Sequence, residues 1–369
     1  MRTARRIAGL AAAPLLLAGL GAVLPPSPGA QDGISDELVE AFRANPMEFF
    51  FEQQPFLAIQ AAEILLRDEA LPAGPRAEIL TTLGTIYVAQ SNDAAARAAF
   101  MEWLAEDPDA ELWNPVIIPM PVKQLFYSLR DSISIARNLK RSAVPKTLAV
   151  GNIENNSVFA GEFDLDRFAR GLVHLITADL SSIPGLTLVD RQRLDVLRDE
   201  IGLNKDADIL DPETAVAFGN LTGAGSFIFG SLMLVDEHKI RIDLRLVETE
   251  TSDVLLAESQ EGTIKKGSDL VKLEQKLVAE NLAGKIQEML ETEGANLKRS
   301  LKDAIQDRDE TDYLELVLAT GRAVLAEEEG DMEAAAAAWS EVAGMDPSDT
   351  TARDRSRALS AFMTYATKE

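Results

Sequence analysis

Apolar residues recur at helical spacing through the first third of the chain, and the pattern predicts helices across residues 34–127. In residues 76–107 this periodicity is interrupted once, at Ser91-Asn92-Asp93, where small polar residues favour a turn. The segment therefore predicts two helices that pack against each other as a hairpin. A Pro-rich connection over residues 113–121 precedes a further predicted helix.

The predicted hairpin carries small and aromatic residues at the offsets of a 34-residue helix–turn–helix repeat. Gly84 and Tyr87 lie in its first helix, Ala96 and Phe100 lie in its second, and Pro108 closes the unit. We expect the helices to approach closely at Gly84 and Ala96, with Phe100 between them. The spacing resembles that of tetratricopeptide repeats, which implies a surface that binds a partner segment.

The C-terminal part of the chain has a weaker form of the same pattern. Gly330, Ala335, Trp339 and Pro347 fit the same register, and residues 328–331 supply the turn. A plain helical hairpin explains these positions equally well. In either case an isolated hairpin cannot bury its apolar faces, so it must pack on other helices, on the central part of the chain or on a partner.

The central part changes from helical spacing to a mixture of strands and helices. An apolar strand is predicted at 147–153, followed by an amphipathic helix that Asp164 caps. Residues 227–234 are almost all apolar, which predicts a strand buried on both faces, whereas 240–246 alternates and predicts a half-exposed strand. We therefore predict an α/β (α+β) module with a mixed sheet and helices, flanked by all-α hairpins.

The sequence of residues 148–262, and the order of its predicted elements, resemble those of the CsgG-like superfamily. That superfamily includes the curli secretion channel, the FlgO flagellar proteins, the LpoB-type activators of penicillin-binding proteins and the N-terminal domain of TolB. The resemblance implies an envelope protein that binds other envelope proteins. The residues that carry the resemblance most clearly are Asp190, Arg191, Gly223, Ala224 and Gly230.

Charge and cysteine content exclude several classes of partner and anchor. The formal net charge is −24, so the chain is repelled by nucleic-acid phosphate, and no basic patch offsets this. There is no cysteine, which excludes disulfides, thiolate chemistry and a lipid anchor on an N-terminal Cys. The lipid attachment that is common in the superfamily is therefore missing.

The N-terminal residues have the order of a secretory signal. Arg2, Arg5 and Arg6 precede an apolar run over 7–24, and Pro-rich, small residues follow up to Ala30. An uncleaved membrane anchor is the alternative interpretation. We expect an exported protein of a Gram-negative-type envelope, in the periplasm or at the periplasmic face of the outer membrane.

We predict no catalytic, metal-binding or cofactor-binding residue. The two histidines, His174 and His238, have no second ligand near them in the sequence, so a structural or solvent role is favoured for each. Residues 204–208 faintly resemble a calcium loop but lack its glycine. Asp164 and Asp166 lie in the first turn of a predicted helix, where the helix dipole explains them.

Together these observations predict four segments: a signal over 1–30, a tetratricopeptide-like helical domain over 31–145, a CsgG-like α/β domain over 146–295 and C-terminal tetratricopeptide-like helices over 296–369. The predicted function is that of a non-enzymatic envelope scaffold that binds envelope proteins, with self-association and peripheral attachment to the outer membrane left open. Alternatives are a CsgG-type secretion-channel subunit, an LpoB-like activator of cell-wall synthesis, and a hydrolase with paired carboxylates.

Overall fold

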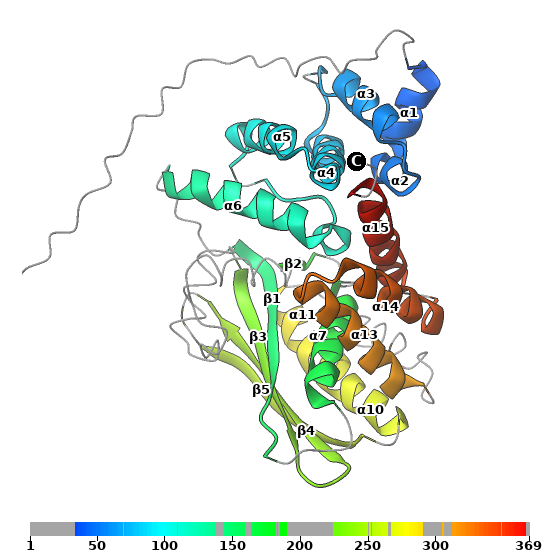
Figure 1. The fold of residues 1–369 in the computed structure, drawn as a ribbon. Coiled ribbons are helices and arrows are strands. Elements are labelled where there is room, and N and C mark those ends of the chain that lie inside the picture. The colour runs from blue at the N-terminus through cyan, green and yellow to red at the C-terminus, as the bar shows by residue number, and fades with distance from the viewer. Residues whose placement is uncertain are drawn as a thin grey trace, which may run out of the picture.

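A helical layer and an α/β module lie one above the other in the computed structural model (Figure 1). The structure describes residues 34–68, 70–108, 110–136, 144–158, 164–181, 183, 185–189, 224–249, 251, 253–264, 267–290, 305, 312–347 and 349–366. The predicted α/β fold class, with a mixed sheet and helical segments, is confirmed.

The helical layer is built from six helices and one 3₁₀ turn: α1 (Asp36–Ala44), α2 (Pro46–Phe51), α3 (Pro55–Leu65), α4 (Ala73–Ala89), α5 (Asp93–Glu106), η1 (Pro115–Ile117) and α6 (Met120–Ala136). Side-chain caps explain where two of them begin. Ser35 accepts a hydrogen bond from the backbone N–H of Leu38, and Asn92 accepts one from Ala95, each at 3.3 Å. The helices enclose a core of their own that includes Phe42, Phe50 and Phe100.

Five strands form the mixed sheet, in the order β2-β1-β3-β4-β5: β1 (Val144–Asn155), β2 (Thr187–Val189), β3 (Ala224–Leu234), β4 (Lys239–Glu248) and β5 (Val254–Thr263). The first three are parallel to one another, and β4 and β5 continue the sheet antiparallel. The central strand β3 is buried on both faces at Phe227 and Ile228, as its apolar sequence predicts.

Helices cover one face of this sheet (Figure 1): α7 (Leu165–Ser181), α10 (Gly267–Glu274), the π-helical segment η2 (Gln275–Leu282) and α11 (Ala283–Met289). Asp164 caps α7 by accepting the backbone N–H of Arg167 at 3.0 Å, as predicted. Between α10 and α11 the chain is π-helical over η2.

Three C-terminal helices connect the two layers: α13 (Tyr313–Glu328), α14 (Met332–Met345) and α15 (Thr350–Ala366). Helix α13 packs along α7 of the module, whereas α15 packs against α2, α4 and η1 of the helical layer (Figure 1). The C-terminal segment therefore holds the two layers together. The division of the chain into three domains stays a prediction, and β1 begins at Val144, two residues before the predicted start of the α/β domain at 146.

Candidate interaction surfaces

The signature residues of the N-terminal hairpin lie in the core of the helical layer. Gly84 of α4 faces Phe100 of α5 so closely that a methyl group at 84 would lie 2.0 Å from the Cζ atom of the ring. Tyr87, Ala96 and Phe100 are buried, and Pro108 follows the end of α5. Burial raises the pKa of the Tyr87 hydroxyl, and the charge of Glu63 raises it further. These side chains belong to the core rather than to a contact surface.

One of the corresponding C-terminal residues, Trp339, contacts a buried ion pair. Gly330 turns the chain after α13 with a φ of +77°, Ala335 and Trp339 are buried in α14, and Pro347 precedes α15. The Trp339 indole donates a hydrogen bond to Glu327 Oε1 at 2.5 Å, and the same carboxylate accepts hydrogen bonds from two nitrogens of Arg355, at 3.0 and 2.5 Å.

This buried cluster fixes how the three C-terminal helices meet α7. The guanidinium of Arg355, on α15, also lies over the Trp339 ring, 4.5 Å from its centroid. The ring of His174, on α7, lies 4.8 Å from that of Trp339, so this histidine packs at a helix junction. His238 lies in the turn between β3 and β4, far from His174 in the sequence and outside α7, the helix that contains His174.

The signature residues of the α/β module are described only in part. Ala224 opens β3, and Gly230 lies in that strand against Leu244 and Ile153, where a methyl group would be 2.7 Å from the Leu244 side chain. Asp190, Arg191 and Gly223 lie outside the described residues, as does the calcium-like sequence at 204–208. The roles predicted for them stay predictions.

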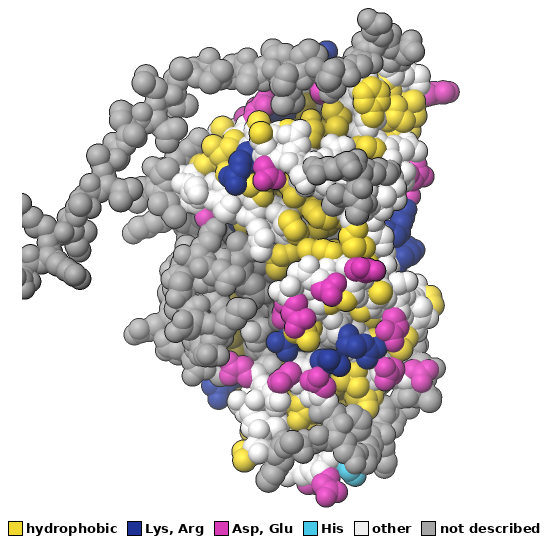
Figure 2. Space-filling view, in the orientation of Figure 1, with side chains coloured by type: hydrophobic (Ala, Val, Ile, Leu, Met, Phe, Trp, Pro, Cys, Tyr) yellow, Lys and Arg dark blue, Asp and Glu magenta, His cyan; other side chains and the backbone are white. Residues whose placement is uncertain are grey.

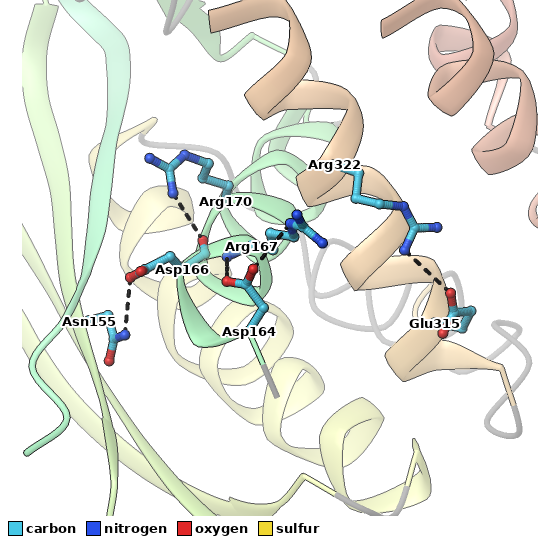
Figure 3. A network of polar contacts seen from close by, with 7 residues as sticks. All are labelled: Asn155, Asp164, Asp166, Arg167, Arg170, Glu315 and Arg322. Atoms are coloured by element: carbon cyan, nitrogen blue, oxygen red, sulfur yellow. Dashed lines mark hydrogen bonds and ion pairs between the residues drawn. The ribbon is translucent and has the colours of Figure 1, made fainter. Parts of the chain in front are cut away.

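A surface network of charged side chains links α7 to its neighbours (Figure 3). Asp166 accepts a hydrogen bond from Asn155 of β1 at 3.0 Å, and Asp164 pairs with Arg167 at 3.1 Å. Arg170 pairs with Glu328 of α13 at 3.0 Å. Both aspartates are thus occupied by capping, hydrogen bonds and an ion pair, which accounts for them without a paired-carboxylate reaction.

Arg322 of α13 links that helix to α14. Its guanidinium lies 3.5 Å from Glu315 of its own helix (Figure 3). It also pairs with Glu341 of α14 at 2.8 Å. Exposed pairs of this kind stabilise a fold only weakly, so the network mainly fixes the orientation of helices that are already packed.

Helix α15 has two apolar faces that join different cores. Ala352 and Leu359 pack with α13 and α14. Four further residues pack in the core of the helical layer: Ala358, Ala361, Phe362 and Tyr365. This placement was not foreseen from the sequence. The arginines of α15 were a signal for acidic partners, because Arg355 pairs with Glu327 of α13 and Arg357 pairs with Glu48 of α2.

Exposed large apolar side chains are found at both ends of the described molecule, and also at Met101, Val254 and Met345. Phe56 and Ile64 protrude from α3 with 48% and 43% of their surface exposed, and hydrophobic side chains are visible over the upper, helical part in Figure 2. Val158 and Val235 follow β1 and β3 at 89% and 43% exposure. Because Ser157 accepts the backbone N–H of Leu234 at 2.9 Å, these two valines share one end of the sheet.

The described residues offer neither a metal cluster nor a membrane-spanning helix. No group of three or more His, Asp or Glu side chains is arranged to hold a metal ion in the described ranges. In those same ranges, none of the helices combines the length and the apolar character that crossing a bilayer requires.

Comparison with known proteins finds similar solved structures but no sequence relative. No protein family and no curated protein matches the chain. The chain is similar to the LpoB C-terminal domain of Salmonella enterica (16% identity, TM-score 0.27, 38% of this chain and 94% of that one). It is also similar to the lipoprotein GNA1162 of Neisseria meningitidis, with 16% identity, a TM-score of 0.28 and coverage of 32% of this chain and 81% of that one. A third similar structure is the LpoB C-terminal domain of Escherichia coli, with 15% identity, a TM-score of 0.27 and coverage of 36% of this chain and 92% of that one.

Proposed function

We propose that the protein is an exported, non-enzymatic scaffold of a bacterial envelope that binds other envelope proteins. The observation that carries the proposal is the presence of exposed apolar residues at two opposite ends, Phe56 and Ile64 on α3 and Val158 and Val235 at the sheet end. A scaffold needs two contact sites held at a fixed separation, and a patch formed by neighbouring exposed apolar side chains marks such a site.

The segments between the two ends are suited to hold that separation. The close crossing of α7 and α13 couples the module to the C-terminal helices, and α15 couples those helices to the helical layer. The buried Glu327–Arg355 pair joins α13 to α15. The separation between the two ends is therefore held by packed helices rather than by a flexible linker.

Sequence features support the compartment and the mode of action. The Arg-rich start and apolar run of residues 1–30 favour export, and the resemblance of 148–262 to the CsgG-like superfamily favours a role in the envelope. The signature residues Gly84, Tyr87, Ala96, Phe100 and Pro108 favour a tetratricopeptide-like hairpin, a unit that serves for protein binding. We assign no cofactor and no catalytic residue.

Site-specific photo-crosslinking in cells that produce the full chain tests this function. A photoreactive phenylalanine analogue placed at Phe56 should give one discrete adduct, and the same analogue at Val235 should give an adduct of a different mass. Met345, which is 36% exposed at the end of α14 between the two ends, is the matched control position. Adducts from neither end, or the same pattern from Met345, would rule out two specific contact sites.

A further inference from the structure

The two helical hairpins of the chain, α4 with α5 and α13 with α14, correspond position by position. A shift of 239 positions, as from Asp93 to Met332, carries both ends of α5 onto both ends of α14. The same shift carries the last residue of α4 onto the last residue of α13. Asn92 caps α5 and its counterpart Asp331 caps α14, each by accepting a backbone N–H three residues further on. Each residue of one hairpin can therefore be compared with its counterpart in the other.

One face of α13 is covered by the α/β module. Gly171 of α7 lies against Val317, so closely that a methyl group on the glycine would be 1.9 Å from the Val317 carbonyl oxygen. One turn earlier, the Tyr313 hydroxyl donates a hydrogen bond to Glu274 of α10 at 2.6 Å. Val317 and Tyr313 are both buried in the core of the module. This face of the C-terminal hairpin thus holds a helix.

The same face of α4 is covered at one end by α2. Thr82, the counterpart of Gly321, is buried, and its hydroxyl oxygen lies 3.6 Å from the sulfur atom of Met47. Helix α2 has six residues, whereas α7 has 17. Six residues of helix span about 9 Å, so α2 covers only part of the face that α7 covers on α13.

The rest of this face of α4 is open. Glu78, the counterpart of Val317, is half-buried rather than buried. Gly74, the counterpart of Tyr313, is exposed, and a methyl group there would meet nothing within 4 Å. Pro75 beside it is also exposed. Positions that make core contacts in the C-terminal hairpin are therefore surface positions in the N-terminal one.

The carboxyl group of Glu78 pairs with no cation in the part of the chain that the structure describes. The nearest arginine in the sequence, Arg76, pairs instead with Glu106 of α5 at 3.1 Å. Burial raises the pKa of the Glu78 carboxyl group. A helix that covered this face and brought a cation to Glu78 would stabilise the ionised carboxylate by a charge-assisted hydrogen bond.

We propose that the open part of α4, formed by Gly74, Pro75 and Glu78, binds a helix of a partner protein in the way that α13 binds α7. The partner helix covers Gly74 and Pro75 with apolar side chains and places one Lys or Arg beside Glu78. Helix α7 on α13 is the internal example of such an occupant. This inference rests on the proposed binding function and names a site and a class of partner for it.

Two fluorescent peptides of residues 165–181 probe the site in the full chain, one with Gly171→Arg and one with Gly171→Glu. Residue 171 lies against Val317 on α13, so its new side chain falls beside Glu78 when the peptide lies on α4. Neither peptide can take the place of α7, because even a methyl group at 171 would lie 1.9 Å from the Val317 carbonyl oxygen. Fluorescence anisotropy measures the binding.

The Gly171→Arg peptide should bind the parent chain saturably below about 1 mM, and the Gly171→Glu peptide should bind at least about fivefold more weakly. A chain with Glu78→Arg should reverse this order. Gly74→Arg occupies the open space and pairs with Glu78 itself, so this chain should bind the Gly171→Arg peptide at least about fivefold more weakly than the parent does. Gly344→Arg, where a methyl group would also meet nothing within 4 Å, is the matched control and should bind as the parent does.

Several results would overturn the proposal. They are no saturable binding of the Gly171→Arg peptide up to about 1 mM, an unchanged order of the two peptides in the Glu78→Arg chain, or equal losses in the Gly74→Arg and Gly344→Arg chains. Dimers of the parent chain that Gly74→Arg dissociates, seen by light scattering, would assign the face to a second copy instead. None of these results depends on the adducts from Phe56 and Val235, so the site can fail while the scaffold function stands, and the reverse also holds.

Discussion

Gly171 of α7 and Gly321 of α13 bring two helix backbones into direct contact. A methyl group at 171 would lie 1.9 Å from the carbonyl oxygen of Val317 and 3.1 Å from the backbone nitrogen of Gly321, and one at 321 would lie 2.0 Å from the carbonyl oxygen of Arg167. The contacts are made by backbone atoms, which cannot turn away as a side chain could. This crossing therefore sets the distance between the α/β module and the C-terminal helices.

Replacing Gly171 by alanine should separate α7 from α13. We expect Gly171→Ala to lower the free energy of unfolding by about 1–3 kcal/mol, because forced repacking outweighs the gain in helix propensity. The matched control is Gly344→Ala in α14, where a methyl group would meet nothing within 4 Å. That change should leave stability equal or raise it by up to about 1 kcal/mol. Denaturant unfolding measures both, and equal effects would contradict the close crossing.

Gly84 and Phe100 should be coupled energetically. Gly84→Ala forces the Phe100 ring out of its place and should cost about 1–3 kcal/mol of stability. Phe100→Leu makes room at that point, so the double variant should lose less than the sum of the two single changes. A double-mutant cycle by urea unfolding measures the coupling. Strict additivity would show that the ring does not limit the approach of α4 and α5.

The sequence predicted local elements better than the contacts between distant parts. The alternation over 240–246, the apolar run over 227–234 and the cap at Asp164 each depend on neighbouring residues, and β4, β3 and α7 lie where these patterns placed them. Nothing in the sequence marks the π-helical segment η2, because apolar residues still recur at nearly helical spacing there.

The contacts of α15 could not be predicted from periodicity. Its two apolar faces show that it has two neighbours, but the pairing of Tyr365 with Phe50 joins residues 315 positions apart. Likewise Gly171 and Gly321 are ordinary helix positions in the sequence, and only the structure shows that each is needed for the same crossing. The candidate surfaces depend on such long-range contacts, so they too required the structure.

The buried Glu327–Arg355 pair should matter far more than the exposed pairs. Glu327→Gln removes the charge that compensates Arg355 and should cost about 3 kcal/mol, because a buried guanidinium is left without its counter-charge. Arg322→Met, which breaks the exposed pair with Glu341, is the control and should cost less than about 1 kcal/mol. Thermal or denaturant unfolding distinguishes them. Similar losses in both variants would mean that the buried pair does not hold α13 to α15.

The raised pKa of Glu78 predicts that the stability of the fold changes with pH. Burial raises the pKa of its carboxyl group, so the folded chain binds this proton more tightly than the unfolded chain. Ionisation of Glu78 therefore costs stability as the pH rises from the ordinary pKa of 4.5 through the raised value. Glu78→Gln removes that cost at neutral pH. The gain should be below about 1 kcal/mol, because the side chain is only partly buried and solvent screens it.

The difference between Glu78→Gln and the parent chain should vanish well below pH 4.5, where both side chains are neutral. Unfolding free energies measured across the acidic range give this comparison directly. A gain that persists undiminished at low pH would assign the effect to packing or helix propensity instead of ionisation.

The native mass of the chain lacking residues 1–30, measured by light scattering after gel filtration with and without detergent, tests the central claim that this is a binding protein and not a channel subunit. The scaffold function predicts a monomer or dimer whose mass is unchanged by detergent. A discrete large ring, especially one that partitions into detergent, would contradict it and favour the CsgG-type secretion channel.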